Sequence, residues 1–310
     1  MSTTSQRSIA IIGAGRIGSA YAYQLAGAGH QITLIARPDS KRLTQLQRDH
    51  GIMLTSGERA DVTVADQLDE REPFDLVIVT TLAHQIDAVL PALERSIAKS
   101  VLFMFVTPEA ERLRAAVGAR RASFGMAGLL ATINGSGKLD LQIGRTKSMQ
   151  GDQRCVDLFN AAGLPSKLEQ DMGRWLRSQT PLTIAMESVT GAGMQHKRGA
   201  TWAEARVGAR GLRAGFSILR ELGETPYPRN KNQISRAPRP MLTFILRMVS
   251  RSKYRDTVGN SAAECRGLID LLAAEGKRNP KLHTEVNALL ALRPNDTSPI
   301  SRARSVSETA

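Results

Sequence analysis

The sequence has few cysteines, few aromatic residues and no long hydrophobic segment. Two cysteines, Cys155 and Cys265, occur among 310 residues, which is too few for a disulfide framework or a cysteine-based metal cluster. Aromatic residues make up 4% of the chain, so few side chains are available for stacking single-stranded nucleic acid. The longest purely apolar run, residues 101–106, is too short to span a bilayer, and residues 1–8 lack the pattern of a signal peptide. We therefore predict a cytoplasmic protein with no metal site, no nucleic-acid partner and no membrane partner.

Positive charge is concentrated in one part of the chain. The formal net charge is +13, and residues 196–256 contain 14 Lys or Arg against four Asp or Glu. Such a surface attracts nucleic acid, anionic lipid or an anionic small molecule. We interpret it as a solvated helical face that also steers an anionic cofactor toward the protein.

One segment of this basic region has the pattern of an amphipathic helix. Residues 240–250 place five apolar side chains on one face and two arginines beside them: Met241, Phe244, Ile245, Met248 and Val249, with Arg247 and Arg251. A basic amphipathic helix can lie on a membrane. Because surface helices of globular proteins routinely show such a stripe, we interpret this face as part of the core.

A glycine-rich motif near the N-terminus indicates a dinucleotide site. A short apolar run, residues 9–12, leads directly into Gly13, Ala14, Gly15, Arg16, Ile17 and Gly18. The first glycine permits a tight turn, the second lets the backbone approach a pyrophosphate, and the third lets the following helix pack closely on the strand. The N-terminus of that helix offers unpaired N–H groups to the phosphates. A helical segment, residues 19–28, and a second strand, residues 31–36, complete the expected unit.

The residue after the second strand selects the cofactor. Sites for NAD place Asp or Glu there to accept a hydrogen bond from the ribose 2′-hydroxyl, whereas this chain has Arg37. A guanidinium pairs well with a 2′-phosphate. We therefore predict NADPH as the cofactor, and interpret the nearby Lys41 and Arg42 as solvated.

Strand and helix patterns alternate through the first half of the chain, and helical patterns follow. We expect strands at 31–36, 51–56, 61–65, 74–80, 101–106 and 164–169, antiparallel strands within 123–144, and helices at 40–50, 84–99 and 155–162, with a further helix beginning at 107–109. Helices are expected at 175–190, 201–222, 240–250, 260–276 and 281–292, with a loop at 225–240. This order predicts an α/β fold, in which an N-terminal Rossmann doubly wound sheet is followed by an all-α C-terminal domain. The predicted domains are 1–169 for NADP binding and 170–292 for substrate binding or dimerisation, with a disordered tail at 293–310.

With these elements in order, the chain resembles the ketopantoate reductases (2-dehydropantoate 2-reductases). The matching positions are the glycine motif, residues 34–37 and 75–80 with Thr80, Gln85, residues 162–164, Trp175, Gly267 and residues 279–280. The resemblance implies a Rossmann domain and a helical domain that bind NADPH and reduce a 2-oxo acid in the cleft between them, in pantothenate biosynthesis. It implies that Thr80 and Gln85 contribute to the cofactor site.

The chain departs from that family where catalysis is expected. Leu82, Phe105 with Val106, Pro181 and Ser261 replace polar family residues, and Arg177 replaces the catalytic lysine. Arginine can stabilise negative charge on the substrate oxygen and grip a carboxylate, but it stays protonated. The resemblance therefore implies catalytic roles for Arg177 and Glu264, with His84, His196 and Lys197 as further candidate proton donors.

Two classes of function follow from this pattern. The first is an NADPH-dependent oxidoreductase acting on a small anionic 2-oxo acid or related carbonyl compound, with ketopantoate itself a poor substrate. The second is a catalytically impaired relative that binds NADPH as a sensor or interaction module. A homodimer is an open alternative for either class.

Overall fold

The computed structural model describes residues 5–144, 146–196, 198–252, 255 and 262–294. By its internal contacts the chain divides into two compact units. Unit 1 consists of Met1–Phe105 and Glu109–Gly173, and unit 2 consists of Val106–Pro108 and Arg174–Ala310. The short segment 106–108 therefore belongs to unit 2 although its neighbours in the sequence belong to unit 1.

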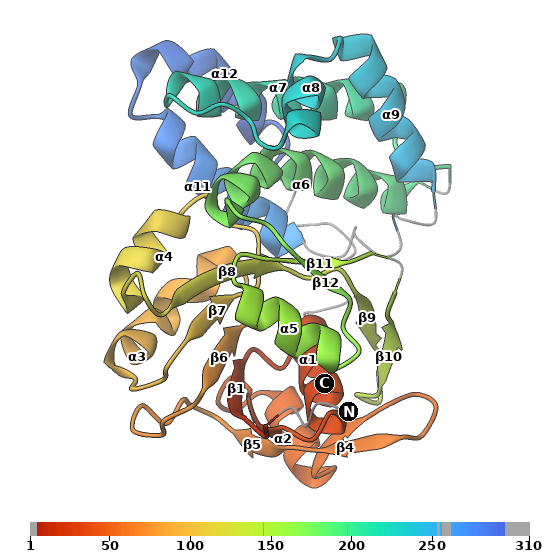
Figure 1. The fold of residues 1–310 in the computed structure, drawn as a ribbon. Helices are drawn as coiled ribbons and strands as arrows, with labels where there is room; N and C mark the ends of the chain where they lie inside the picture. The colour runs from red at the N-terminus through yellow and green to blue at the C-terminus, as the bar shows by residue number, and fades with distance from the viewer. Residues whose placement is uncertain (1–4, 145, 197, 253–254, 256–261, 295–310) are drawn as a thin grey trace. The chain divides into compact units, whose positions relative to one another are not determined.

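An eight-stranded sheet forms the centre of unit 1 (Figure 1). The strand order is β12-β11-β8-β7-β6-β1-β2-β5, and every neighbouring pair is parallel except β8 with β11. The strands are β1 (Ser8–Ile12), β2 (Gln31–Ile35), β5 (Thr63–Ala65), β6 (Leu76–Val79), β7 (Val101–Phe103), β8 (Ala122–Met126), β11 (Ser148–Gln150) and β12 (Ser166–Leu168). This topology confirms the predicted fold class for the first part of the chain.

The central strands are buried on both faces, which explains their continuous apolar runs. Every residue of β6 and β7 is buried, as are residues 9–12 of β1. Runs of this kind, rather than alternating patterns, are typical of parallel strands covered by helices. Ile12 pairs with Ile35 on one side and Val79 on the other, so β1, β2 and β6 end level with one another. The loops that follow these three strands therefore meet at one edge of the sheet.

The helices of unit 1 follow the predicted order with one correction. They are α1 (Arg16–Gly27), α2 (Lys41–Arg48), the 3-10 helix η1 (Ala83–Ala88), α3 (Leu90–Arg95), α4 (Ala110–Val117) and α5 (Gln153–Ala161). A single helix over 84–99 is wrong, because η1 and α3 are separate and residues 96–99 are not helical. Pro91, in the first turn of α3, has no backbone N–H with which to continue a helix from η1.

Two antiparallel hairpins accompany the sheet. The first joins β3 (Gly51–Met53) to β4 (Arg59–Asp61), and the second joins β9 (Leu130–Ile133) to β10 (Leu139–Gln142). In the second turn, the Asn134 side-chain oxygen accepts hydrogen bonds from the backbone N–H groups of Ser136 at 3.1 Å and Lys138 at 2.9 Å. The expected antiparallel strands within 123–144 are thus confirmed, and the side chain of Asn134 stabilises their turn.

In the described residues, unit 2 consists of helices and their connections. These are α6 (Met172–Gln195, which begins in unit 1), α7 (Trp202–Glu221), α8 (Arg229–Arg236), α9 (Arg239–Arg251), α11 (Ala262–Gly276), the 3-10 helix η2 (Pro280–Leu282) and α12 (His283–Leu290). The predicted all-α second part is confirmed. None of the helices in the described ranges is long and apolar enough to cross a membrane. The predicted tail beyond residue 294 and the expected helix start at 260–261 lie outside the described residues.

Two predictions for unit 2 are wrong. The expected loop at 225–240 contains helix α8, whose one apolar side chain is Ile234 and which buries Lys231 and Ser235. The apolar face predicted to be core in α9 is largely exposed: Met241, Phe244, Ile245 and Met248 each expose 46–55% of their surface. A different face of α9, which carries Leu242 and Leu246, packs inward instead.

Candidate nucleotide site

The loop between β1 and α1 has the backbone conformation that its first glycine predicts. Gly13 has a φ of +106°, which L side chains rarely adopt. Its N–H donates to the Ile35 carbonyl at 2.9 Å, so the loop is joined to the end of β2. A Cβ atom at Gly13 would lie 2.9 Å from Thr80 Oγ1. Both the backbone angle and the lack of space therefore require glycine here.

The other two glycines differ in what surrounds them. A Cβ at Gly18 would lie 1.9 Å from the Gly13 carbonyl oxygen, so only glycine lets α1 pack this closely against the loop. A Cβ at Gly15 would have no neighbouring heavy atom within 4 Å in the described structure. Gly18 therefore serves packing inside unit 1, whereas Gly15 borders open space into which a ligand could fit.

Thr80 supports the loop from the next strand. Its hydroxyl lies 3.1 Å from the Ile12 carbonyl oxygen and 2.9 Å from that of Gly13, and its backbone N–H donates to Ile12 at 2.9 Å. These contacts join the end of β6 to the end of β1. The structure thus brings Thr80, predicted as a cofactor residue, directly against the glycine motif.

Arg42, which the sequence pattern led us to regard as solvated, is a structural support of this loop. Its Nε donates to the Ala14 carbonyl at 3.1 Å, Nη2 donates to Ser19 Oγ at 2.8 Å, and Nη1 donates to the Gly137 carbonyl at 2.7 Å and to Gln45. Burial lowers the pKa of Arg42 to about 10, so the side chain is still charged at neutral pH. Arg42 therefore holds the glycine motif, α1 and the β9–β10 hairpin together and adds a positive charge behind the loop.

The first turn of α1 is suited to an anion. Gly15 is the N-cap residue, no side chain in the described structure caps the helix, and the first turn holds no acidic residue. Arg16 begins the helix, and Ile17 packs against the core beside it. The uncapped N–H groups and the positive end of the helix dipole favour a phosphate at this position.

Arg37 and Gln85, the other two predicted cofactor residues, are exposed. Arg37 follows β2, its carbonyl accepts a hydrogen bond from Ser40 Oγ at 2.7 Å, and its guanidinium forms no ion pair within the described residues. The Gln85 side-chain oxygen accepts from the Leu82 N–H at 3.3 Å and so caps the first turn of η1. The roles of both residues in cofactor binding stay predictions.

Arg177 is enclosed by acidic partners within unit 2. Its Nε pairs with Glu224, Nη2 lies 2.6 Å from Glu275 Oε2, and Nη1 donates to the Pro108 carbonyl at 2.5 Å. The three charged side chains expose only 17–27% of their surface. Burial raises the pKa of Glu224, and the positive charge of Arg177 offsets only part of this effect. Few N–H groups of Arg177 are left to grip a substrate carboxylate.

The remaining described catalytic candidates lie outside α6, the helix that carries Arg177. Glu264 is half-buried on α11 next to Cys265, whose pKa is raised by burial and by the nearby Glu187 and Glu264. His196 Nε2 lies 3.0 Å from Glu204 Oε1, close to the start of α7. His84 is exposed on η1. Lys197 and Ser261 lie outside the described residues.

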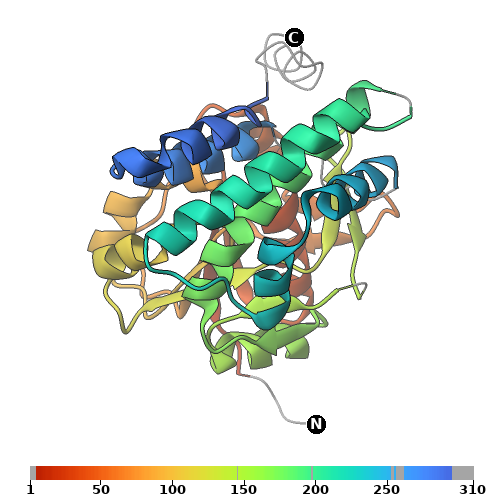
Figure 2. The ribbon, with the colours of Figure 1, turned by 90° about the horizontal axis from the view of Figure 1, so that it is seen from above.

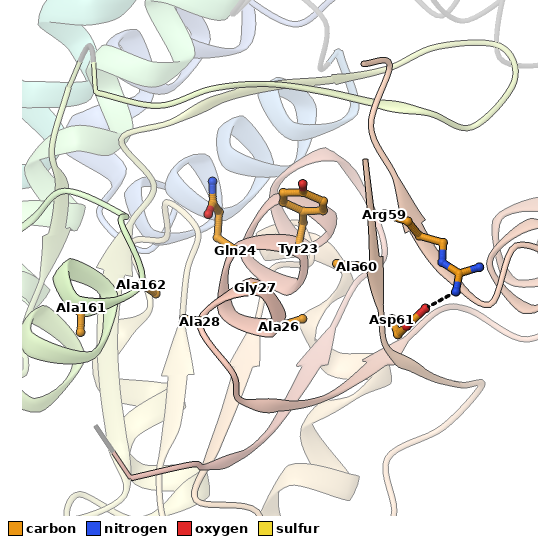
Figure 3. Close-up of a pocket in the computed structure, with 10 residues that line it drawn as sticks. All are labelled: Tyr23, Gln24, Ala26, Gly27, Ala28, Arg59, Ala60, Asp61, Ala161 and Ala162. Carbon is orange, nitrogen blue, oxygen red and sulfur yellow. Dashed lines mark ion pairs between the residues drawn. The ribbon is translucent and has the colours of Figure 1, made fainter. Parts of the chain in front are cut away.

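A surface depression of about 610 Å³ lies elsewhere in unit 1 (Figure 3). It is lined by the C-terminal part of α1, by β4 with the Arg59–Asp61 ion pair, and by Ala161 and Ala162 at the end of α5. The glycine motif lies at the opposite end of α1. This depression is therefore separate from the candidate nucleotide site.

The parallel sheet, the glycine loop and the uncapped helix give unit 1 a Rossmann-type fold. Residues 9–151 match the family model described as ketopantoate reductase PanE/ApbA. Through these residues the first part of the chain is similar to the ketopantoate reductase PanE/ApbA family. A search of curated proteins finds no match.

Solved structures show that the fold of the whole chain is shared. A PanE/ApbA family ketopantoate reductase from Ralstonia eutropha JMP134 is 20% identical, with a TM-score of 0.71 over 97% of this chain and 99% of that one. D-mandelate dehydrogenase in complex with NADH is 15% identical, with a TM-score of 0.69 and the same coverage. A 2-dehydropantoate 2-reductase from Geobacter metallireducens GS-15 is 17% identical, with a TM-score of 0.64 over 91% of this chain and 98% of that one. At these identities the comparisons establish the fold alone.

Proposed function

We propose that the protein is an NADPH-dependent oxidoreductase of the ketopantoate reductase type, which reduces a small 2-oxo acid or a related carbonyl compound. The observation that carries the proposal is the open space above Gly15 at the uncapped N-terminus of α1. The backbone N–H groups of this turn, with Arg16 beside them, fit a pyrophosphate. When bound, NADPH supplies the hydride.

The choice of NADPH rests on Arg37. Its guanidinium follows β2, is exposed and has no carboxylate partner among the described ion pairs. We infer that it pairs with the 2′-phosphate, in the manner of arginines at this position in other NADP sites. Thr80 and Arg42 act differently, because they hold the loop in shape from the protein side.

Reduction of a ketone builds negative charge on the substrate oxygen, which then takes up a proton. We propose Arg177 as the group that stabilises this charge, acting through N–H groups that Glu224 and Glu275 leave available. Since arginine stays protonated, the proton must come from another group or from water. Glu264, His84 and His196 are the described candidates.

A second function is favoured by the contacts of Arg177. A guanidinium paired with two carboxylates and one carbonyl has little capacity left to bind a substrate. On this alternative the protein binds NADPH as a sensor or interaction module and turns over no substrate. Ketopantoate turnover in pantothenate biosynthesis, a cytoplasmic location and a homodimer likewise stay predictions.

Cofactor titration tests the first part of the proposal. Purified protein should bind NADPH more tightly than NADH, measured by the change in nicotinamide fluorescence. Arg37→Asp should weaken NADPH binding by about tenfold or more while NADH binding changes little, because a charge-assisted pair of this kind contributes about 1.5–3 kcal/mol. Arg71→Asp, at another exposed arginine of unit 1, should leave both affinities unchanged. Equal affinity for the two cofactors would remove the argument from Arg37.

Turnover separates the enzyme from the binding module. NADPH oxidation should be followed by absorbance with a panel of 2-oxo acids, including ketopantoate. Turnover with any of them supports the enzyme, and we expect ketopantoate to be slow, since loss of one charge-stabilising donor costs about 100- to 1,000-fold in rate. NADPH binding without turnover across the panel would favour the module.

A further inference from the structure

Helix α9 carries apolar side chains on its outer face. Met241, Phe244, Ile245 and Met248 expose 48%, 55%, 46% and 48% of their surface. Their spacing of three, four and seven residues from Met241 places them on one stripe of the helix. Large apolar side chains clustered in the open are unusual for a monomer and mark an interaction site.

Trp202 of α7 extends this stripe. It exposes 45% of its surface, and its ring lies 6.5 Å from that of Phe244, measured between centroids. Figures 1 and 2 show α7 and α9 side by side in the helical unit. We call the five residues Trp202, Met241, Phe244, Ile245 and Met248 the α9 surface.

Positive charge borders the α9 surface. The Arg247 guanidinium carbon lies 4.6 Å from the centroid of the Trp202 ring, and Arg251 is exposed one turn further along α9. Residues 239–252 contain no Asp or Glu. The carboxylate closest in sequence to Trp202 is Glu204, which already accepts from the Thr201 N–H at 2.7 Å and contacts His196. In the described part of the chain, neither Arg247 nor Arg251 forms an ion pair.

We propose that the α9 surface docks on an anionic lipid bilayer. A helix with an apolar stripe flanked by arginines lies in the plane of a membrane interface, with the apolar side chains among the acyl chains and the arginines at the phosphates. Tryptophan is enriched at this depth. This inference is independent of the proposed reductase activity and replaces the sequence-based prediction of no membrane partner.

Charge argues for a bilayer over a second copy of this chain. Two α9 surfaces pressed face to face would bring their arginines together without acids to pair them, and like charges across an interface are costly. Nucleic acid would satisfy the arginines but would leave Phe244, Ile245 and the two methionines in contact with water. A lipid surface accommodates both kinds of side chain.

Vesicle flotation tests the proposal with the full-length protein. The protein should float with vesicles that contain phosphatidylglycerol and phosphatidylcholine, should not float with phosphatidylcholine alone, and should be released by salt. The double variant Phe244→Ser/Ile245→Ser should lower the partition coefficient by about tenfold or more, because two partly buried apolar side chains are lost. Arg247→Gln/Arg251→Gln should also lower it, by about 25-fold, since each of the two basic residues near the bilayer contributes about fivefold.

Matched controls and competing outcomes complete the experiment. Ile97→Ser removes a side chain that is 56% exposed in unit 1, and Arg71→Gln removes an exposed charge there; both should bind like the wild type. All variants should keep the NADPH affinity and unfolding temperature of the wild type, which shows that they fold. Lack of binding to anionic vesicles, or equal binding by the Phe244→Ser/Ile245→Ser variant, would overturn the proposal. So would a dimer in light scattering that this variant abolishes, or duplex DNA binding that it weakens.

Discussion

The glycine loop of unit 1 and the part of α6 around Arg177 in unit 2 hold their arginines in opposite ways. At the loop, Arg16 and Arg37 form no ion pair within the described residues, and the helix N-terminus has no acidic residue. On α6, Arg177 pairs with both Glu224 and Glu275. The loop region therefore has positive charge available for an anion from outside, whereas the charge on α6 is balanced by the protein itself. On the proposed function, cofactor binding depends on the first region and catalysis on the second, so substitutions can test the two separately.

The largest effects are expected within the glycine motif, where two substitutions should separate folding from binding. Gly15→Val should abolish NADPH binding and leave the unfolding temperature unchanged, because a side chain there meets no protein atom within 4 Å but fills the space for a phosphate. Gly18→Val should destabilise unit 1 by about 3 kcal/mol or more, since its Cβ would overlap the Gly13 carbonyl. NADPH titration and thermal unfolding measure the two effects.

The control for these variants must replace a glycine with an ordinary backbone angle, which excludes Gly57 because its φ is +104°. Gly27→Val is better matched, since Gly27 is a helical glycine at the far end of α1 with no atom within 4 Å of its Cβ. It should keep both NADPH binding and stability close to the wild type. Normal binding by folded Gly15→Val protein would show that the loop is not the nucleotide site.

Arg177→Ala tests the part of α6 in which the arginine is paired with two carboxylates. It should abolish turnover of any substrate found and leave NADPH affinity nearly unchanged. It should also destabilise unit 2 by about 3 kcal/mol, because it leaves two largely buried carboxylates without their cation; the figure is at the low end for buried pairs since all three groups are partly exposed. Urea unfolding followed by tryptophan fluorescence reports on unit 2, which contains both tryptophans.

A triple variant separates the two roles of Arg177. Arg177→Met combined with Glu224→Gln and Glu275→Gln removes the cation together with the charges that it neutralises, so most of the lost stability should return. Turnover should stay absent if Arg177 acts on the substrate. Activity restored along with stability would mean that Arg177 only holds the helices in place.

Local chemistry explains which parts of the fold could be predicted from the sequence. Strand β1 and the glycine turn after it are determined by residues close together in the sequence and by their backbone angles, as the positive φ of Gly13 shows. A short stretch of sequence is therefore enough to predict them. Helix α8 could not be predicted from a repeated pattern of apolar residues, because its buried side chains are those of Lys231 and Ser235. In α9, periodicity showed that an apolar face exists, but Leu242 and Leu246 supply a second face, and only packing decides which one turns inward.

The supporting contacts of the candidate site could not be predicted, because they join residues far apart in the chain. Arg42 donates to Gly137, which is 95 residues away, and Arg177 pairs with Glu275, which is 98 residues away. No short motif encodes such a pair. A surface arginine and a buried one have the same appearance in a single sequence.

Arg42→Met tests whether the glycine loop of unit 1 needs the contacts of the Arg42 guanidinium. Removing the guanidinium leaves the Gly137 carbonyl without its donor and the Ala14 carbonyl with only Ser19 Oγ at 3.2 Å, which should cost about 2 kcal/mol of stability. Because the same contacts shape the loop, NADPH affinity should also fall. Arg48→Met on the same helix is the matched control, since Arg48 is 70% exposed and should contribute little. Full NADPH affinity in Arg42→Met protein would show that the loop holds its shape without this support.

The smallest expected effect is a difference in pH dependence between the two units. In unit 1, a hydrogen bond from the Lys99 ammonium at 2.7 Å and one from the Ser8 N–H hold the pKa of Asp75 below its usual range. In unit 2, burial raises the pKa of Glu224. The stabilisation from Asp75 is therefore present above the ordinary aspartate pKa of 3.8 and is lost as the pH falls through the lowered value. The contribution from Glu224 is fully present below the ordinary glutamate pKa of 4.5 and is lost as the pH rises through the raised value.

Neutral variants should reveal these two signs. Relative to the wild type, Asp75→Asn should become less stable as the pH rises from 3 toward neutral, by less than about 1 kcal/mol because Lys99 is well exposed. Glu224→Gln should become more stable relative to the wild type as the pH rises above 4.5. Circular dichroism follows the first variant and tryptophan fluorescence the second, each in urea across the pH range.

A contrary outcome would be equal slopes of relative stability against pH for the two variants. This would mean that the carboxylate of Glu224 is as well stabilised by Arg177 as that of Asp75 is by Lys99. The Arg177 guanidinium would then be bound entirely by its internal partners, in contrast to Arg16 and Arg37 near the glycine loop, which form no ion pair within the described residues.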